Sequence, residues 1–149
     1  MVIYKDITFN EVSIIKDLWE RNRKYHEKIS KDFGFLYSNI IFEDRISGFK
    51  SFNEENIKIT IAIDDKASRV IGYCISTYEH DKGEIQTIHV LEECRGLGVG
   101  KHLINLHISW LKIKKCNSIV LSVDCNNSNT IEFYKSMGFG ENIIEMRLK

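Results

Sequence analysis

The 149-residue sequence contains no proline, so its chain breaks must come from glycine, asparagine, aspartate and serine. It also has no net charge, because 21 Lys and Arg balance 21 Asp and Glu. No overall basic field therefore favours nucleic acid or an anionic membrane. No apolar run approaches the roughly 20 residues of a membrane span, and the first residues, MVIYKDITFN, do not form a signal peptide. We expect a cytoplasmic protein with no nucleic-acid or membrane partner.

Cysteines are few and lie far apart. None of them forms a CxxC pair, so neither a disulfide framework nor a zinc site is expected, and we predict no metal ligand. We expect four reduced, partly buried thiols, at Cys74, Cys94, Cys116 and Cys125.

The apolar content is sufficient for one core. The sequence is 43% hydrophobic and 28% charged, which is too apolar for a disordered chain. Its length fits a single domain over residues 1–149.

Hydrophobic periodicity predicts alternating strands and helices. Residues 80–83, HDKG, are typical of a hairpin turn, and Asn10 is a candidate N-cap. The order β-α-α-β-β-β-α-β-α-β has no internal repeats and implies an α/β (α+β) fold with helices on both faces of a mixed sheet. The expected strands are 2–7, 57–64, 69–79, 84–90, 118–124 and 142–148, and the expected helices are 9–29, 38–49, 99–115 and 130–137, the last ending at Gly138.

The segment CRGLGVGKHL, residues 94–103, has three glycines at alternate positions. It is not a Walker A loop, because Arg95 stands where the first glycine is required and His102 where Ser or Thr is required. It is not a GxGxxG fingerprint either, because Lys101 or Leu103 would have to be glycine.

The position of this segment still favours an anion. It runs from a strand into a strong helix, where free N–H groups and the helix dipole attract negative oxygen atoms. Arg95 and Lys101 can add positive charge. The alternative is that the glycines only permit tight strand-to-helix packing.

Two motifs resemble a known family. Residues 95–100, RGLGVG, are similar to the Q/R-x-x-G-x-G/A pyrophosphate loop of the GNAT (Gcn5-related) N-acetyltransferases. Residues 127–139, NSNTIEFYKSMGF, resemble their N-x-x-A-x-x-x-Y-x-x-x-G-F segment, with Thr130 where alanine is usual. The resemblance covers about residues 57–148 and implies a mostly antiparallel central sheet of six to seven strands with about four helices.

The resemblance implies acetyl-CoA as co-substrate. Its pyrophosphate would bind the N–H groups of residues 95–100, and its pantetheine arm would lie between the strands that end near Val90 and Asp124. An N–H group near Val90 would stabilise the thioester oxygen. The residues expected to bind the cofactor are Ile88, His89, Val90, Arg95, Gly96, Leu97, Gly98, Val99, Gly100, Lys101, Asn127 and Tyr134.

The resemblance also implies catalytic roles. Tyr134 matches the tyrosine that protonates the leaving thiolate, and Glu84 occupies the position of a glutamate that removes a proton through water. A core tyrosine and a solvated hairpin carboxylate are the alternatives. His80, His89 and ordered water are rival bases. Strict alternation would place Glu84, Gln86, Ile88 and Val90 on one face of their strand, unless a bulge redirects them.

The implied acceptor is a primary amine, either a small molecule such as a polyamine, amino acid or aminoglycoside-like compound, or a peptide amine. A non-catalytic acyl-CoA-binding regulatory module is the alternative, and a nucleotide-binding module is a weaker one. The sequence leaves a homodimer open. Aromatic walls with carboxylates would suit a cation, and the candidates near the first two helices are Trp19, Tyr25, His26, Phe33, Phe35 and Tyr37 with Glu20, Glu27 and Asp32.

Overall fold

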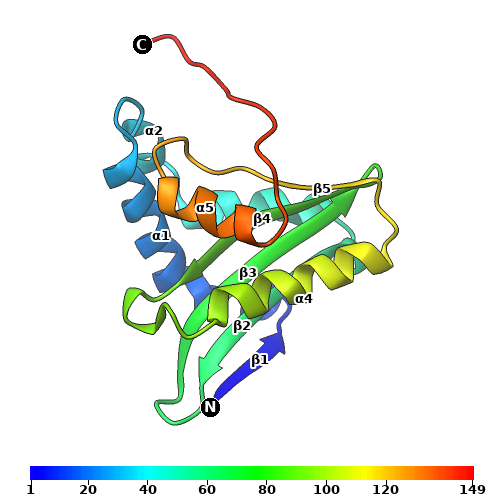
Figure 1. Cartoon of the computed structure of the whole chain (residues 1–149). Coiled ribbons are helices and arrows are strands. Elements are labelled where there is room, and N and C mark those ends of the chain that lie inside the picture. The colour runs from blue at the N-terminus through cyan, green and yellow to red at the C-terminus, as the bar shows by residue number, and fades with distance from the viewer.

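The computed structural model describes residues 1–149 and contains one five-stranded sheet in the order β1-β2-β3-β4-β5 (Figure 1). Neighbouring strands are antiparallel from β1 to β4, whereas β5 is parallel to β4. The strands are β1 (Val2–Asp6), β2 (Ile57–Asp64), β3 (Arg69–Glu79), β4 (Lys82–Val90) and β5 (Ser118–Leu121).

Helices cover both faces of this sheet. Helices α4 and α5 lie on one face, and α1 and α3 lie on the other (Figure 1). None of the helices combines the length and apolar character needed to cross a membrane. The α-helices are α1 (Lys16–Ile29), α2 (Phe35–Ser38), α3 (Phe42–Ser47), α4 (Val99–Ile113) and α5 (Ser128–Ser136), and the 3₁₀ turns are η1 (Phe9–Ile15), η2 (Gly48–Ser51), η3 (Glu54–Asn56) and η4 (Glu92–Cys94).

The sheet is smaller than expected. Strands β2 and β3 confirm their predicted spans, but residues 142–148 form no strand, so the sheet has five strands rather than six to seven. The observed order lacks the final β, and the chain end runs away from the sheet (Figure 1). Alternating apolar residues show that a segment can form a strand. The strand forms only if a neighbouring strand is available for backbone hydrogen bonding. The apolar side chains of this segment are exposed: Ile143, Ile144, Met146 and Leu148.

The first predicted helix begins differently from the expectation. It consists of the 3₁₀ turn η1 followed by α1, and Thr8 rather than Asn10 precedes it. The Thr8 N–H donates to Glu11 Oε1 at 3.3 Å, which satisfies one of the free donors at the start of the turn. The second predicted helix, 38–49, is divided among α2, α3 and η2.

The β3–β4 hairpin turns through two residues. His80 and Asp81 have φ of 50° and 62°, while Glu79 pairs with Lys82. Positive φ at both central residues gives a type I′ turn, whose twist matches that of the strands. Strand β4 therefore begins at Lys82, two residues earlier than predicted.

The core fills both sides of the sheet. Leu103, Ile104 and Leu111 of α4 are fully buried on one side. His107 lies among them, with Nδ1 at 2.7 Å from Ser76 Oγ and Nε2 at 2.9 Å from Thr60 Oγ1. These two bonds tie the middle of α4 to β3 and β2. They therefore help to fix the position of the whole helix on the sheet.

Candidate active site

Strands β4 and β5 separate at a bulge. Thr87 pairs with Ile75 and Ile85 with Ser76, which leaves Gln86 as an extra residue in β4. The pairing of β4 with β5 stops at the same point, after Ile85. Because a bulge bends its strand, β4 turns away from β5 here and leaves residues 86–90 with an open edge.

The bulge also changes which side chains share a face. Glu84 pairs with Thr77 and Ile88 with Cys74, so the side chains of Glu84 and Ile88 lie on opposite faces of the sheet. Gln86 lies on the face of Glu84, because its Nε2 donates to Thr77 Oγ1 at 2.9 Å. Strict alternation was therefore wrong for this strand.

The open edge presents backbone donors. The Leu91 N–H donates to Ile71 O of β3 at 2.9 Å, so the N–H groups of Val90 and Ile88 alternate to the other side, away from β3. The Val90 carbonyl accepts from Arg95 Nε at 3.1 Å. Arg95 is thereby fixed at the end of the open edge, where the glycine-rich loop begins.

Two glycines of this loop have a left-handed backbone. Gly96 and Gly98 both have φ of 82°, and a Cβ on either would meet nothing within 4 Å. Glycine is thus needed here for conformation rather than for close approach. A Cβ on Gly100 would lie at an ordinary 3.8 Å from Phe133 and Val90, so tight packing does not explain the loop.

The loop exposes a row of unused donors. The N–H groups from Gly96 to Lys101 have no acceptor within the chain, and the first helical bond is made by His102 N–H to Gly98 O at 3.0 Å. Leu97 is 73% exposed. These donors lie at the positive end of the 15-residue helix α4, which suits a phosphate or pyrophosphate.

Helix α5 brings two predicted residues to the split. Asn127 is its N-cap, and its Oδ1 accepts from Thr130 N–H and from the Tyr25 hydroxyl, both at 3.4 Å. Tyr134 is only 7% exposed, and its hydroxyl has no hydrogen-bond partner in the chain. Burial raises the pKa of Tyr134, with Cys74 adding to the shift, so the hydroxyl keeps its proton at neutral pH.

The end of α5 holds Tyr134 in place. Gly138 has φ of 100° and follows the last helical residues, as predicted. The Phe139 N–H donates to Tyr134 O at 3.1 Å, which completes a Schellman cap. The rings of Phe139 and Tyr134 meet edge to face with centroids 5.8 Å apart.

Glu84 lies at the closed end of the split. It is paired with Val120 of β5, and its Oε1 is 3.5 Å from Lys82 Nζ. A cavity of about 380 Å³ opens beside it, lined by Phe52, Thr77, Glu79, His80, Lys82, Glu84 and Gln86.

The two rival histidines differ in environment. His89 is 8% exposed, and burial together with the charges of Arg95 and His26 lowers its pKa to about 4. It is therefore neutral at neutral pH. His80 is in the hairpin turn with its side chain 91% exposed.

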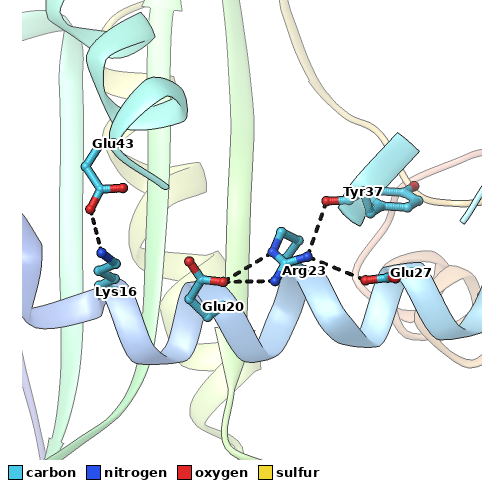
Figure 2. Close-up of polar contacts among 6 residues, drawn as sticks. All are labelled: Lys16, Glu20, Arg23, Glu27, Tyr37 and Glu43. Carbon is cyan, nitrogen blue, oxygen red and sulfur yellow. Dashed lines mark hydrogen bonds and ion pairs between the residues drawn. The ribbon is translucent and has the colours of Figure 1, made fainter. Parts of the chain in front are cut away.

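The predicted acceptor carboxylates are already paired. Figure 2 shows Arg23 donating to Glu20 at 3.1 Å, to Glu27 at 3.4 Å and to the Tyr37 carbonyl at 3.5 Å. Asp32 pairs with Lys149 at 3.2 Å. Glu20 and Glu27 thus share one guanidinium, and Asp32 has a lysine partner, so all three carboxylates expected to attract a cation already bond to a basic side chain.

A different carboxylate lies beside the predicted aromatic residues. Asp124 Oδ2 accepts from the Tyr37 hydroxyl at 3.0 Å, and the Tyr37 ring stacks on His26 with centroids 5.4 Å apart. Tyr25 lies next to them, with Arg95 at 5.6 Å over its ring. The sequence indicated Tyr25, His26 and Tyr37 but not Asp124 as their carboxylate, because Asp124 and Tyr37 are 87 positions apart and local periodicity does not report which distant segments meet.

Comparisons with known proteins show the family and the fold of this chain. The model of the Acetyltransferase (GNAT) family matches residues 13–139. An uncharacterised N-acetyltransferase of Methanocaldococcus jannaschii is 39% identical over 72 residues, which are 48% of this chain and 46% of that protein. The match thus spans about half the length of this curated relative.

Solved structures show the same fold over the whole chain. A tetramutant of a Bacillus halodurans protein has a TM-score of 0.76 at 19% identity and covers 99% of both chains. The aminoglycoside N-acetyltransferase AAC(6')-Iy, solved with a bisubstrate analog of CoA and acetylneamine, has a TM-score of 0.71 at 16% identity and covers 100% of this chain and 99% of its own.

Proposed function

Because the chain belongs to the Acetyltransferase (GNAT) family, we propose that it transfers an acetyl group from acetyl-CoA to a primary amine. One observation supports this above the others: six consecutive N–H groups without acceptors, from Gly96 to Lys101, lie beside the open edge of β4. The loop offers donors to a pyrophosphate, and the open edge offers donors to an extended amide-containing arm.

The cofactor would follow these two rows of donors. Its pyrophosphate would bind the N–H groups of residues 96–101, because the Arg95 N–H already donates to Glu92 O at 3.2 Å, and Lys101 would add charge at the rim. Its pantetheine arm would lie along Ile88, His89 and Val90, and the open-edge N–H groups of Ile88 and Val90 also suit the thioester oxygen. Asn127, at the start of α5, would contact the arm from the other wall of the split.

Tyr134 is the proposed general acid. Its hydroxyl is protonated, makes no hydrogen bond within the chain and is not sealed from solvent, so it can donate to the departing sulfur without first breaking a bond within the protein. The amine nitrogen forms the new bond to the acetyl carbon, the carbon–sulfur bond breaks, and the thiolate takes the tyrosine proton. Tyr134 then regains a proton from solvent.

Glu84 is the proposed carboxylate on the path of the released proton. It lies four residues before Ile88, which is about 13 Å along a strand. It therefore acts through water rather than by touching the amine. Its cavity beside the hairpin is open enough to hold that water.

Calorimetric titration tests the cofactor assignment. We expect one saturable site for acetyl-CoA and for CoA, and no comparable site for ATP or NAD. Lys101→Ala should weaken acetyl-CoA binding several-fold, whereas Lys112→Ala, at the other end of α4, should leave it unchanged. Equal affinity for ATP or NAD, or no heat with acetyl-CoA, would contradict the assignment.

A further inference from the structure

One buried side-chain nitrogen in the chain lacks a hydrogen-bond partner, namely His26 Nδ1. The second ring nitrogen, Nε2, also makes no hydrogen bond within the protein, although it is not sealed from solvent. Buried polar groups are almost always satisfied, so an orphan of this kind calls for an explanation. A histidine with both nitrogens free can bind or exchange a proton with an incoming group.

His26 belongs to the cluster that faces the split. The last pair between β4 and β5 is Ile85 with Leu121, and beyond it the two diverging segments continue to Ile88, on the open edge, and to Asp124. The open-edge N–H of Ile88 is one of those proposed for the thioester. His26 is close enough to Asp124 and to His89 for their charges to affect one another.

Asp124 is a carboxylate without a cation. Its Oδ1 accepts from Asn126 N–H at 2.8 Å and its Oδ2 from the Tyr37 hydroxyl at 3.0 Å, but it makes no ion pair. These two bonds fix its orientation. A negative charge held in this way attracts an ammonium group and stabilises a neighbouring imidazolium.

We propose that His26 is a further catalytic residue, which receives the proton of the attacking amine while Asp124, held by Tyr37, stabilises the imidazolium. This role rests on the proposed function and deepens it. The N–H bond of the ammonium breaks, the proton passes to the imidazole, and the electron pair left on nitrogen forms the bond to the acetyl carbon. The nitrogen of this adduct still carries one surplus proton, which leaves through water toward Glu84 as the carbon–sulfur bond breaks and Tyr134 protonates the thiolate. His26 then releases the proton to solvent, and Glu84 lies further along that path.

The protonation state of His26 agrees with this role. Burial lowers the pKa of His26, and the Asp124 charge only partly offsets the shift. The other titratable groups around it are Tyr25, with its ring centroid at 5.8 Å, His89 on β4 and Tyr37 on α2. The pKa values of His89 and Tyr37 are shifted so that both are neutral at neutral pH. Arg23 and Glu27 on its own helix are paired with each other. His26 is thus neutral and ready to accept a proton.

The test uses His26→Gln, with Lys28→Gln, an exposed change on the same helix, as the matched control. For an amine that the wild type acetylates, we expect kcat of His26→Gln to fall by roughly 100-fold at neutral pH with an unchanged acetyl-CoA Kd. The deficit should shrink as the pH approaches the pKa of the amine, because the substrate then arrives without its proton. Asp124→Asn should lower kcat by a smaller factor, and Lys28→Gln should have no effect.

Other results would overturn the role. A His26→Gln variant within twofold of wild type at neutral pH, or one with the same deficit at every pH, would remove the proton-accepting function of His26 alone. A folded wild type that binds acetyl-CoA but acetylates no amine would overturn the proposed function and this role together. If His26→Gln does not fold, an Asp124→Asn variant with wild-type kcat would count against the pair.

Discussion

Tyr134 and His107 are both deeply buried polar side chains, but only His107 has its hydrogen bonds made within the protein. Each ring nitrogen of His107 meets a hydroxyl group, on Ser76 and on Thr60. The Tyr134 hydroxyl meets none, and unlike His26 Nδ1 it is not sealed from solvent. At the scale of single residues, a satisfied buried group indicates a structural role, and an unsatisfied one beside a row of free donors indicates a functional role.

The first prediction concerns the Tyr134 hydroxyl. Tyr134→Phe keeps the ring contacts with Phe133 and Phe139 and removes only a hydroxyl that bonds to nothing in the chain. We expect kcat to fall by roughly 100-fold and the acetyl-CoA Kd and the thermal stability to stay the same. Steady-state kinetics and calorimetry measure both. Tyr78→Phe, in the hairpin, is the control, and an unaffected kcat in Tyr134→Phe would instead support a non-catalytic acyl-CoA-binding module.

The second prediction concerns the left-handed backbone at Gly98. Gly98→Ala should destabilise the fold by about 1–2 kcal/mol, because a Cβ is disfavoured at positive φ even though no atom obstructs it. It should also weaken acetyl-CoA binding by tilting the N–H groups of the loop. Gly140→Ala is the control, since its Cβ meets nothing and its φ is ordinary. Equal unfolding midpoints for the two variants in urea would show that the loop tolerates the change.

At the scale of elements, the two halves of β4 differ in how they pair with neighbouring strands. Its first half pairs with strands on both sides, and its second half has a free edge. The sequence predicts where this strand lies, but not the bulge at Gln86, because an extra residue changes the register without changing the local composition. The bulge is what separates Glu84 from the side-chain face of Ile88 and opens the split.

The third prediction concerns the packing of β4 on α4. A Cβ at Gly83 would lie 2.7 Å from Leu111 Cδ2 and 3.2 Å from Cys116 Sγ, and Leu111 is fully buried. Gly83→Ala should therefore cost about 1–3 kcal/mol of the free energy of unfolding through overpacking. Gly48→Ala, where a Cβ meets nothing, should cost far less. The thermal midpoints of the two variants provide the comparison, and a stabilised Gly83→Ala would refute the close fit of β4 and α4.

At the scale of the whole molecule, local sequence patterns predicted the helices and strands better than the tertiary contacts between them. The spans of β2 and β3 and the Gly138 end of α5 follow from local patterns and are confirmed. The bonds from Tyr25 to Asn127 and from Tyr37 to Asp124 join residues 102 and 87 positions apart. Such contacts depend on the packing of α1 across the split, which no periodicity encodes. Local patterns wrongly predicted a strand at 142–148 for the same reason, because a strand forms only where it can pair with the edge of another strand.

The fourth prediction concerns stability as a function of pH. Burial lowers the pKa of His107 to about 3, while the unfolded chain has an ordinary histidine near pH 6.5. Between these values the unfolded chain binds more protons, so stability is present above about pH 6.5 and is lost as the pH falls. We expect the free energy of unfolding to drop by about 2 kcal/mol from pH 7 to pH 5 for this group.

Urea unfolding at the two pH values measures this slope. His107→Gln should make it shallower, because the amide does not titrate, while His89, whose pKa is also lowered, keeps part of the slope. His102→Gln, an exposed change on the same helix, should leave the slope unaltered. A wild-type stability that is constant between pH 7 and pH 5 would show that His107 is not the buried neutral group described here.

The most direct test of the account is acetyl transfer itself. Purified protein is mixed with acetyl-CoA and a panel of primary amines, free CoA thiol is followed over time, and the amines are analysed by mass spectrometry. The account predicts thiol release that depends on one class of amine and on the Tyr134 hydroxyl, with the product heavier by one acetyl group. Saturable binding of acetyl-CoA without thiol release or acetylated product from any amine would contradict it.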